Sequence, residues 1–302
     1  MKRHDPWSLL PHEVFFGLFL LITWMRLGLA VGFLGGDALL YLALLAANAW
    51  VIWFCRSDGS SIRWRVGLLF YPLAMNIVFL HMKTAIPKIH PERMDALLQR
   101  LDTLGVGTNL SLRLQPWTQP ALTEFFSFCY ILFFPCLLFS MIYYFCGEVA
   151  LLKRFVSGLF AIYGLGFLGY SLLPAAGPYL SMTDQFTKPL DGWWVTKWNA
   201  AIVTAGSNKV DVFPSLHCAV SCFLLFFDRR HRPWRFKLYL VPAVGLWLST
   251  IYLRYHYFID VLAGFALAAF ALWLARRSPP KPDGGLPLPT TPPTPTADAT
   301  TK

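Results

Sequence analysis

Charged side chains are scarce in this chain. They make up 14% of its 302 residues, and hydrophobic residues make up 56%. A soluble globular domain carries about 25% charged residues, so the composition excludes an ordinary soluble fold. Acidic residues are the fewest, with 16 Asp and Glu against 26 Lys and Arg, which gives a formal net charge of +10. Several apolar runs approach the roughly 20 residues that a membrane-spanning helix needs. The sequence therefore predicts an integral membrane protein.

Three further absences narrow the class. The alternation of apolar and polar residues that is typical of an outer-membrane barrel is missing. The six cysteines lie in or beside apolar segments without metal-ligand spacing, so we expect neither a disulfide framework nor a metal centre from them. Basic residues lie mostly in short connections between apolar runs, which indicates membrane orientation and argues against nucleic-acid binding.

Eight apolar segments predict an all-α fold, a polytopic membrane helical bundle of about eight transmembrane helices. For the first segment a signal peptide is the alternative, because a basic start precedes it and the stretch ending at Ala30 resembles a cleavage site. The run continues through Leu34 and a second run follows at once, which favours a mature helix. The segments are 14–34, 38–54, 66–82, 122–145, 155–173, 214–227, 236–254 and 256–275.

The distribution of lysine and arginine predicts the orientation of these helices. Basic residues are enriched in short cytoplasmic loops. Here they precede the first segment and follow the second, fourth, sixth and eighth. With eight spans, all of these positions fall on one face, which predicts a multi-pass protein with both termini in the cytoplasm. The long connections 83–121 and 174–213 then lie on the extracytoplasmic face.

The first long connection contains an amphipathic pattern. Met94, Leu97, Leu98 and Leu101 follow the i, i+3, i+4, i+7 spacing of one helical face. Two interpretations remain open for this helix. It lies in the membrane interface, or it packs on the outer loops as a soluble helix does.

Ionisable residues occur at the start of two apolar segments on the predicted extracytoplasmic face. His217 begins the sixth segment just after Pro214, and His256 and Asp260 begin the eighth behind Arg254. Ionisable groups at membrane depth are costly and usually mark a functional site. Each helix start also directs free N–H groups and a positive dipole end outward, where an anion is stabilised. The pattern predicts an enclosed phosphate site.

The residue types suggest roles at such a site. Asp260 lies four residues after His256, so its carboxylate can hold one ring nitrogen protonated and leave the other as a nucleophile. His217 is placed to act as a general acid, and the Arg254 fork matches phosphate oxygens. The alternatives are a structural His–Asp pair, a structural His217, and a metal site formed by both histidines and Asp260. The joint occurrence of all four residues favours catalysis, and we expect no metal or other cofactor.

Two stretches resemble motifs of a known family. Phe213-Pro214-Ser215-Leu216-His217 and the stretch 252–264 resemble the second and third motifs of the type-2 phosphatidic acid phosphatase superfamily. They are most similar to its branch containing fungal inositol phosphorylceramide synthase and bacterial relatives. Residues 170–178 resemble that branch's segment at the end of the preceding span. The resemblance covers about 94–275 and is strong from 170 onward.

The resemblance implies a role for each matching residue. His256 would attack phosphorus and form a phosphohistidine, and Asp260 would orient it. His217 would protonate the departing alkoxide and later activate the acceptor. Ser215 and Arg254 would hold the non-bridging oxygens.

Basic residues are missing where the larger superfamily has them. The segment from Tyr170 to Pro178 lacks the lysine and the Arg-Pro pair of the first motif, and Ser249-Thr250 stands in place of a Ser-Arg pair. Tyr170 and Lys209 are therefore added to the candidate phosphate-binding residues. For Lys209 the alternative is a solvated loop lysine.

These observations predict a membrane enzyme that cleaves a lipid phosphate ester at the extracytoplasmic face. With water as acceptor it is a lipid phosphatase, and with a lipid hydroxyl it is a head-group transferase like inositol phosphorylceramide synthase. A non-catalytic lipid-binding membrane protein is the alternative from another class. The expected partners are the bilayer and a lipid phosphate or phospholipid. The predicted regions are a three-helix membrane segment at 1–82, the amphipathic connection at 83–121, a catalytic helix core at 122–277 and a disordered Pro/Thr-rich tail at 278–302.

Overall fold

The computed structural model describes residues 9–57 and 60–277, so the predicted disordered tail at 278–302 lies outside the described residues. Within these ranges the chain folds into helices joined by short connections, and no strand occurs. This confirms the predicted all-α class. The first helices are α1 (Pro11–Val31), α2 (Gly36–Arg56), α3 (Ser61–Leu68), α4 (Phe70–Ile89), α5 (Asp95–Val106), α6 (Leu110–Leu114), η1 (Gln115–Trp117), α7 (Pro120–Ile131) and α8 (Phe133–Phe145). The remaining ones are α9 (Val149–Leu172), α10 (Pro178–Ser181), η2 (Thr183–Gln185), α11 (Trp194–Gly206), α12 (Leu216–His231), α13 (Pro233–Tyr252) and α14 (Phe258–Arg277).

Each of the eight predicted segments lies on one of these helices or on a consecutive pair. Six helical stretches of the described chain are long and apolar enough to cross a membrane: α1, α2, α3 with α4, α7 with α8, α9 and α14. The segments predicted at 214–227 and 236–254 form α12 and α13, which do not meet that criterion. α12 has only 16 residues, fewer than the roughly 20 of a full span. It carries the predicted site residue His217.

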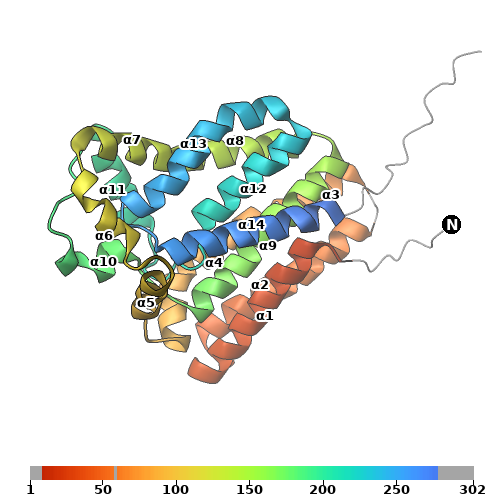
Figure 1. The fold of residues 1–302 in the computed structure, drawn as a ribbon. Helices are drawn as coiled ribbons and strands as arrows, with labels where there is room; N and C mark the ends of the chain where they lie inside the picture. The colour runs from red at the N-terminus through yellow and green to blue at the C-terminus, as the bar shows by residue number, and fades with distance from the viewer. Residues whose placement is uncertain (1–8, 58–59, 278–302) are drawn as a thin grey trace, which may run out of the picture.

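α9 is the central helix of the bundle. It packs against α1 on one side and against α12 and α14 on the other (Figure 1). Close helix contacts in membranes depend on small residues, and Gly164 is one of them. A methyl group added there would lie 2.9 Å from the backbone of Phe15 in α1. Glycine is therefore required for α1 to lie this close to α9.

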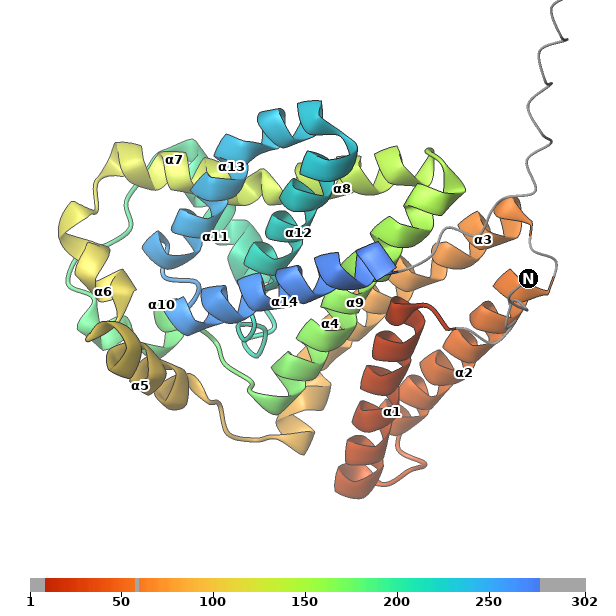
Figure 2. The ribbon, with the colours of Figure 1, turned by 45° about the vertical axis from the view of Figure 1, so that its right-hand side comes forward.

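The helices outside the spans gather at one end of the bundle, where α12 and α14 begin. α5, α6, α10 and α11 lie there (Figure 2). α5 is the predicted amphipathic helix, and it binds this end through two buried carboxylates. Asp95 accepts hydrogen bonds from the backbone N–H groups of Ala176 and Gly177. Asp102 accepts from those of Phe258 and Ile259, both at 2.9 Å.

Some apolar residues of α5 are buried and others are exposed. Leu98 is fully buried against Met182, Val212 and Tyr257. Other leucines of α5 are exposed, with 75% of the Leu104 surface accessible. The helix therefore packs on the outer loops through one face. The prediction that its apolar side also contacts the membrane interface stays a prediction.

Candidate functional site

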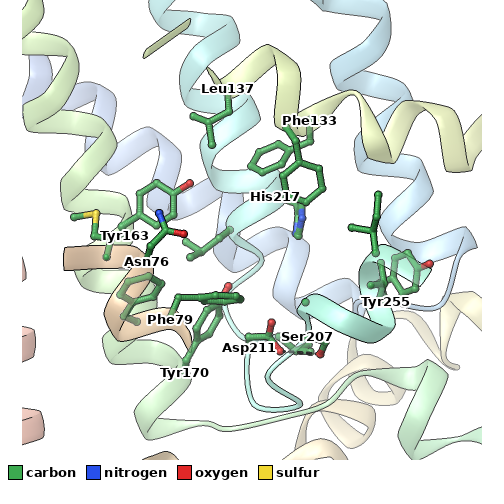
Figure 3. Close-up of a pocket in the computed structure, with 18 of the residues that line it drawn as sticks. Asn76, Phe79, Phe133, Leu137, Tyr163, Tyr170, Ser207, Asp211, His217 and Tyr255 are labelled. Atoms are coloured by element: carbon green, nitrogen blue, oxygen red, sulfur yellow. Dashed lines mark hydrogen bonds between the residues drawn. The ribbon is translucent and has the colours of Figure 1, made fainter. Parts of the chain in front are cut away.

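A cavity of about 420 Å³ opens among α4, α7, α8, α9, α11 and the start of α12. Both predicted histidines, His217 and His256, line it. Most other lining side chains are aromatic or aliphatic, and the polar ones outside the histidines include Asn76, Ser207 and Asp211. Figure 3 shows the His217 ring entering this space from one side and Ser207 and Asp211 from the other. Such a lining suits a ligand with a large apolar part and a small polar one.

The two histidine rings converge although 39 positions separate them along the chain. Their centroids are 6.0 Å apart. The His217 ring lies between Tyr130 and Phe133, with both ring centroids at 4.7 Å. These aromatic contacts fix the direction of the His217 ring.

His256 and Asp260 form the expected pair. Nδ1 of His256 lies 3.5 Å from Oδ2 of Asp260, and both side chains are buried. His256 is not on the helix, however, because α14 begins two residues later than the predicted start at 256. The backbone carbonyl of Thr250 accepts hydrogen bonds from the N–H groups of Tyr255 and His256, both at 3.0 Å. This turn at the end of α13 holds His256 above the start of α14.

The start of α14 is capped by carboxylates, which corrects the expectation that its N–H groups are free for an anion. Oδ2 of Asp260 accepts a hydrogen bond from the N–H of Tyr257 at 2.8 Å. The next two N–H groups bind Asp102 of α5. The first turn of a helix has N–H groups without a helical partner, and here protein side chains bind three successive N–H groups. These three N–H groups at the start of α14 are therefore not free to bind an anion.

Ser215 is the N-cap residue of α12. Its backbone N–H donates to the carbonyl of Asp260 at 3.0 Å, and its hydroxyl accepts from the N–H of Cys218 at 3.4 Å. Pro214 consequently precedes the cap and does not occupy the first turn as predicted. Ser215 is fully buried and does not line the cavity, whereas Tyr170 does. Ser215 thus connects α12 to α14 through the backbone.

Arg254 and Lys209 do not line the cavity. The Arg254 guanidinium donates to the carbonyl of Lys188 at 2.6 Å and lies 4.0 Å above the Phe186 ring. Lys209 is exposed. Among the residues that the structure describes, no lysine or arginine lines the cavity. The phosphate-binding roles of both residues stay predictions, and each side chain would have to move to fulfil them.

Thr250 occupies the position at which the family that the motifs resemble has an arginine. It is fully buried, and its hydroxyl donates to the carbonyl of Trp247 at 2.7 Å. Its Oγ1 lies 3.9 Å from Sγ of Cys218 in α12. At this position the chain therefore has a helix–helix contact instead of a cation.

Asp211 is a residue of the cavity that lies outside the sequence motifs. Its carboxylate lines the cavity and accepts a hydrogen bond from the Ser207 hydroxyl at 3.2 Å. Burial raises the pKa of Asp211, and burial lowers the pKa of His256 to about 4, although the nearby Asp211 charge acts in the opposite direction. A lone carboxylate between Val210 and Val212, just before the second motif, was the signal available in the sequence.

The tryptophans of the loop 174–213 lie away from the cavity. Trp193, Trp194 and Trp198 are 50% to 73% exposed, as expected for anchors at a membrane interface. α11 instead contributes its C-terminal end to the cavity, through residues such as Val203 and Ser207.

The described residues contain no group of three or more His, Cys, Asp or Glu side chains that could hold a metal ion. The alternative metal site at His217, His256 and Asp260 therefore has no support in the geometry.

Known proteins show similarity to the part of the chain that carries these residues. A family model described as the PAP2 superfamily matches residues 96–274. Phosphoinositol dihydroceramide synthase of Bacteroides thetaiotaomicron is 29% identical over 153 residues, which cover 46% of this chain and 50% of the relative. A PA-phosphatase related-family protein of Dictyostelium discoideum is 28% identical over 125 residues, which cover 40% of this chain and 23% of the relative. The chain thus spans half or less of these relatives. No solved structure gives a significant match.

Proposed function

The chain belongs to the PAP2 superfamily, and from this membership we propose that it is a membrane-embedded phosphatase or phosphotransferase that cleaves a lipid phosphate ester through a phosphohistidine. The observation that carries the proposal is the convergence of two imidazoles on one cavity, with centroids 6.0 Å apart and a carboxylate behind the second ring. A nucleophile, an orienting group and an acid are the parts that such a displacement needs.

In the proposed reaction, His256 attacks phosphorus through Nε2. Nδ1 of His256 lies 3.5 Å from Oδ2 of Asp260 without a hydrogen bond in the structure, and this contact would shorten as the ring becomes positively charged. His217 donates its proton to the departing oxygen as the P–O bond breaks. It then takes a proton from the acceptor, whose oxygen displaces His256 from phosphorus. Both histidines return to their starting states.

The charges around the cavity support a substrate with little negative charge. In the described part of the chain no lysine or arginine lines the cavity, and Asp211 adds a carboxylate. The group that would stabilise the phosphate is the start of α12, where the helix dipole is positive. A phosphodiester carries one negative charge and fits this group better than a phosphomonoester dianion. This favours head-group transfer from a phospholipid over hydrolysis of a phosphatidate.

The lining of the cavity also favours a lipid alcohol over water as the acceptor. The cavity has a volume of about 420 Å³, and its aromatic lining provides an apolar space beside the histidines. Apolar surroundings exclude water from a reacting centre. A lipid alcohol fits such a space, and its hydroxyl can donate to Asp211. The similarity to a phosphoinositol dihydroceramide synthase is consistent with this acceptor. The site is proposed to face the extracytoplasmic side, as the distribution of basic residues predicts.

A lipid-resolved assay tests the proposal. Purified protein would be given phosphatidate, an isoprenyl diphosphate, or phosphatidylinositol together with ceramide, and products would be separated by mass spectrometry. We expect turnover with the third mixture and an acid-labile phosphoprotein during turnover. His256→Ala should abolish both, because no other residue can accept the phosphoryl group at that position.

His90→Ala is the matched control, since it also removes an imidazole but lies outside the cavity, where Nδ1 contacts the carbonyl of Glu92. Wild-type turnover by His256→Ala would remove the assigned nucleophile. Stable lipid binding without turnover of any mixture by the wild-type protein would favour the non-catalytic lipid-binding alternative.

A further inference from the structure

A second, smaller pocket lies at the opposite end of the helices that carry the histidine site. It has a volume of about 90 Å³ and lies among α9, α12 and α14. His217 and Arg230 occur at the two ends of α12, about 20 Å apart at 1.5 Å per residue. Figure 1 shows that the start of α9 and the ends of α12 and α14 lie on the same side of the bundle. The pocket is therefore separate from the proposed active site.

Basic side chains from three helices line this pocket. They are Arg154 of α9, Arg230 and His231 of α12, and Arg276 of α14. Arg154 and Arg230 are close enough to act electrostatically on the His231 ring. Among the residues at 9–57 and 60–277, no Asp or Glu lines the pocket. Asp228, one turn earlier in α12, binds Arg235 at 3.0 Å and Tyr144, so its charge is already paired.

The positive charge exceeds what the helix ends can neutralise. A helix C-terminus is equivalent to about half a negative charge, so the ends of α12 and α14 together offset about one of the two charges of Arg230 and Arg276. The remaining excess is of the size that one phosphate group balances. Arginine guanidinium groups also match phosphate oxygens in geometry. The pocket therefore has the charge and the donor groups of a phosphate site.

The other half of the lining is apolar and adjoins the lipid-facing surface. Phe226 lines the pocket and is 38% exposed. Nearby, Trp273 is 44% exposed and the Arg277 guanidinium lies 4.2 Å above its ring. Aromatic and basic residues together are typical of a membrane–water boundary. A lipid could place its head group on the arginines and its chains along Phe226.

We propose that this basic pocket binds the phosphate group of an anionic lipid in the leaflet opposite the active site. Basic pockets between transmembrane helices are a known form of lipid head-group site. The inference does not depend on the proposed enzymatic function. It assigns a ligand to residues that the histidine chemistry does not use.

The test compares two double variants that lose the same charge from the same helix ends. Arg230→Gln with Arg276→Gln removes two arginines that line the pocket. Arg229→Gln with Arg277→Gln removes their neighbours, which do not line it. Each purified protein would be titrated with phosphatidylglycerol or phosphatidylcholine in neutral detergent and examined by native mass spectrometry. Size-exclusion and thermal unfolding would verify that both variants fold.

We expect the pocket variant to bind phosphatidylglycerol about tenfold or more weakly than the wild type, given the attraction of each basic residue for anionic lipid. The control variant should bind it as the wild type does, and phosphatidylcholine binding should be equal in all three. A parallel titration with inorganic phosphate distinguishes a lipid phosphate from a soluble phosphate as the ligand. Thermal stabilisation by phosphate that only the pocket variant loses, without any phosphatidylglycerol preference, would assign the pocket to a soluble phosphate. Equal phosphatidylglycerol binding by both double variants would overturn the proposal.

Discussion

Replacement of Gly264 by alanine should move His217, at the start of α12, away from His256. Gly264 lies in the first half of α14, where that helix crosses the start of α12. A methyl group there would lie 2.5 Å from the carbonyl oxygen of Ser215 and 3.3 Å from the N–H nitrogen of Ala219. The first distance is about 1 Å shorter than an ordinary contact. Both neighbours are backbone atoms, so no side-chain rotation can relieve the overlap.

The start of α12 must therefore move by about 1 Å away from α14, and it carries His217. A misplacement of 1 Å between reacting groups can cost about 100-fold in rate. We expect kcat of Gly264→Ala to fall by about 30- to 100-fold with little change in KM, because the aromatic cavity remains. Overpacking costs about 1–3 kcal/mol, and the better helix propensity of alanine offsets about 1 kcal/mol of it. The protein should remain folded.

Gly105→Ala is the matched control. Gly105 is an exposed residue of α5, and a methyl group there would meet nothing within 4 Å. This variant should keep its turnover and gain up to about 1 kcal/mol of stability. The assay is lipid head-group transfer together with thermal unfolding. Wild-type kcat in a folded Gly264→Ala protein would refute the idea that the α12–α14 contact sets the distance between the histidines.

Two further predictions concern the charge and orientation of the site. His256 must be neutral to attack, and burial lowers its pKa to about 4, so kcat/KM should fall as the pH decreases through about 4. The Asp211 charge raises that pKa, so Asp211→Asn should move the acidic limb to lower pH, and a limb that moves to higher pH would contradict the assignment. Cysteines introduced at Trp194 and His231 should differ in labelling by an impermeant reagent added outside, with only position 194 reacting. Reaction at position 231 alone would invert the proposed orientation.

The sequence predicted the secondary structure well because the apolar runs are long and continuous. Hydrophobicity alone places a helix in a membrane, and each predicted segment lies on a helix of the structure. The lengths of the helices were predicted less accurately than their positions. α12 is shorter than a full span because Ser215 caps it and the chain turns again at Arg232. Such ends depend on side-chain hydrogen bonds that hydropathy does not record.

The candidate site was predictable where its residues belong to a motif. His217, His256 and Asp260 lie at the beginnings of two apolar runs, and the structure brings all three together. Arg254 lies within the stretch 252–264 that resembles the third motif, and Lys209 was chosen as a basic residue just before the second motif. Nearness in sequence does not determine the direction of a side chain, and Arg254 instead contacts Lys188 and Phe186.

The sequence by itself determined the membrane class, the positions of the helices and the identity of the paired histidines, because apolar runs and short motifs are local properties of the chain. Only the tertiary structure decided that Asp102 of α5 occupies the N–H groups of α14, and that Asp211 faces the cavity. It also decided that no arginine or lysine of the described ranges, 9–57 and 60–277, lines that cavity. These features depend on contacts between segments far apart in the sequence. They arise only when the helices pack.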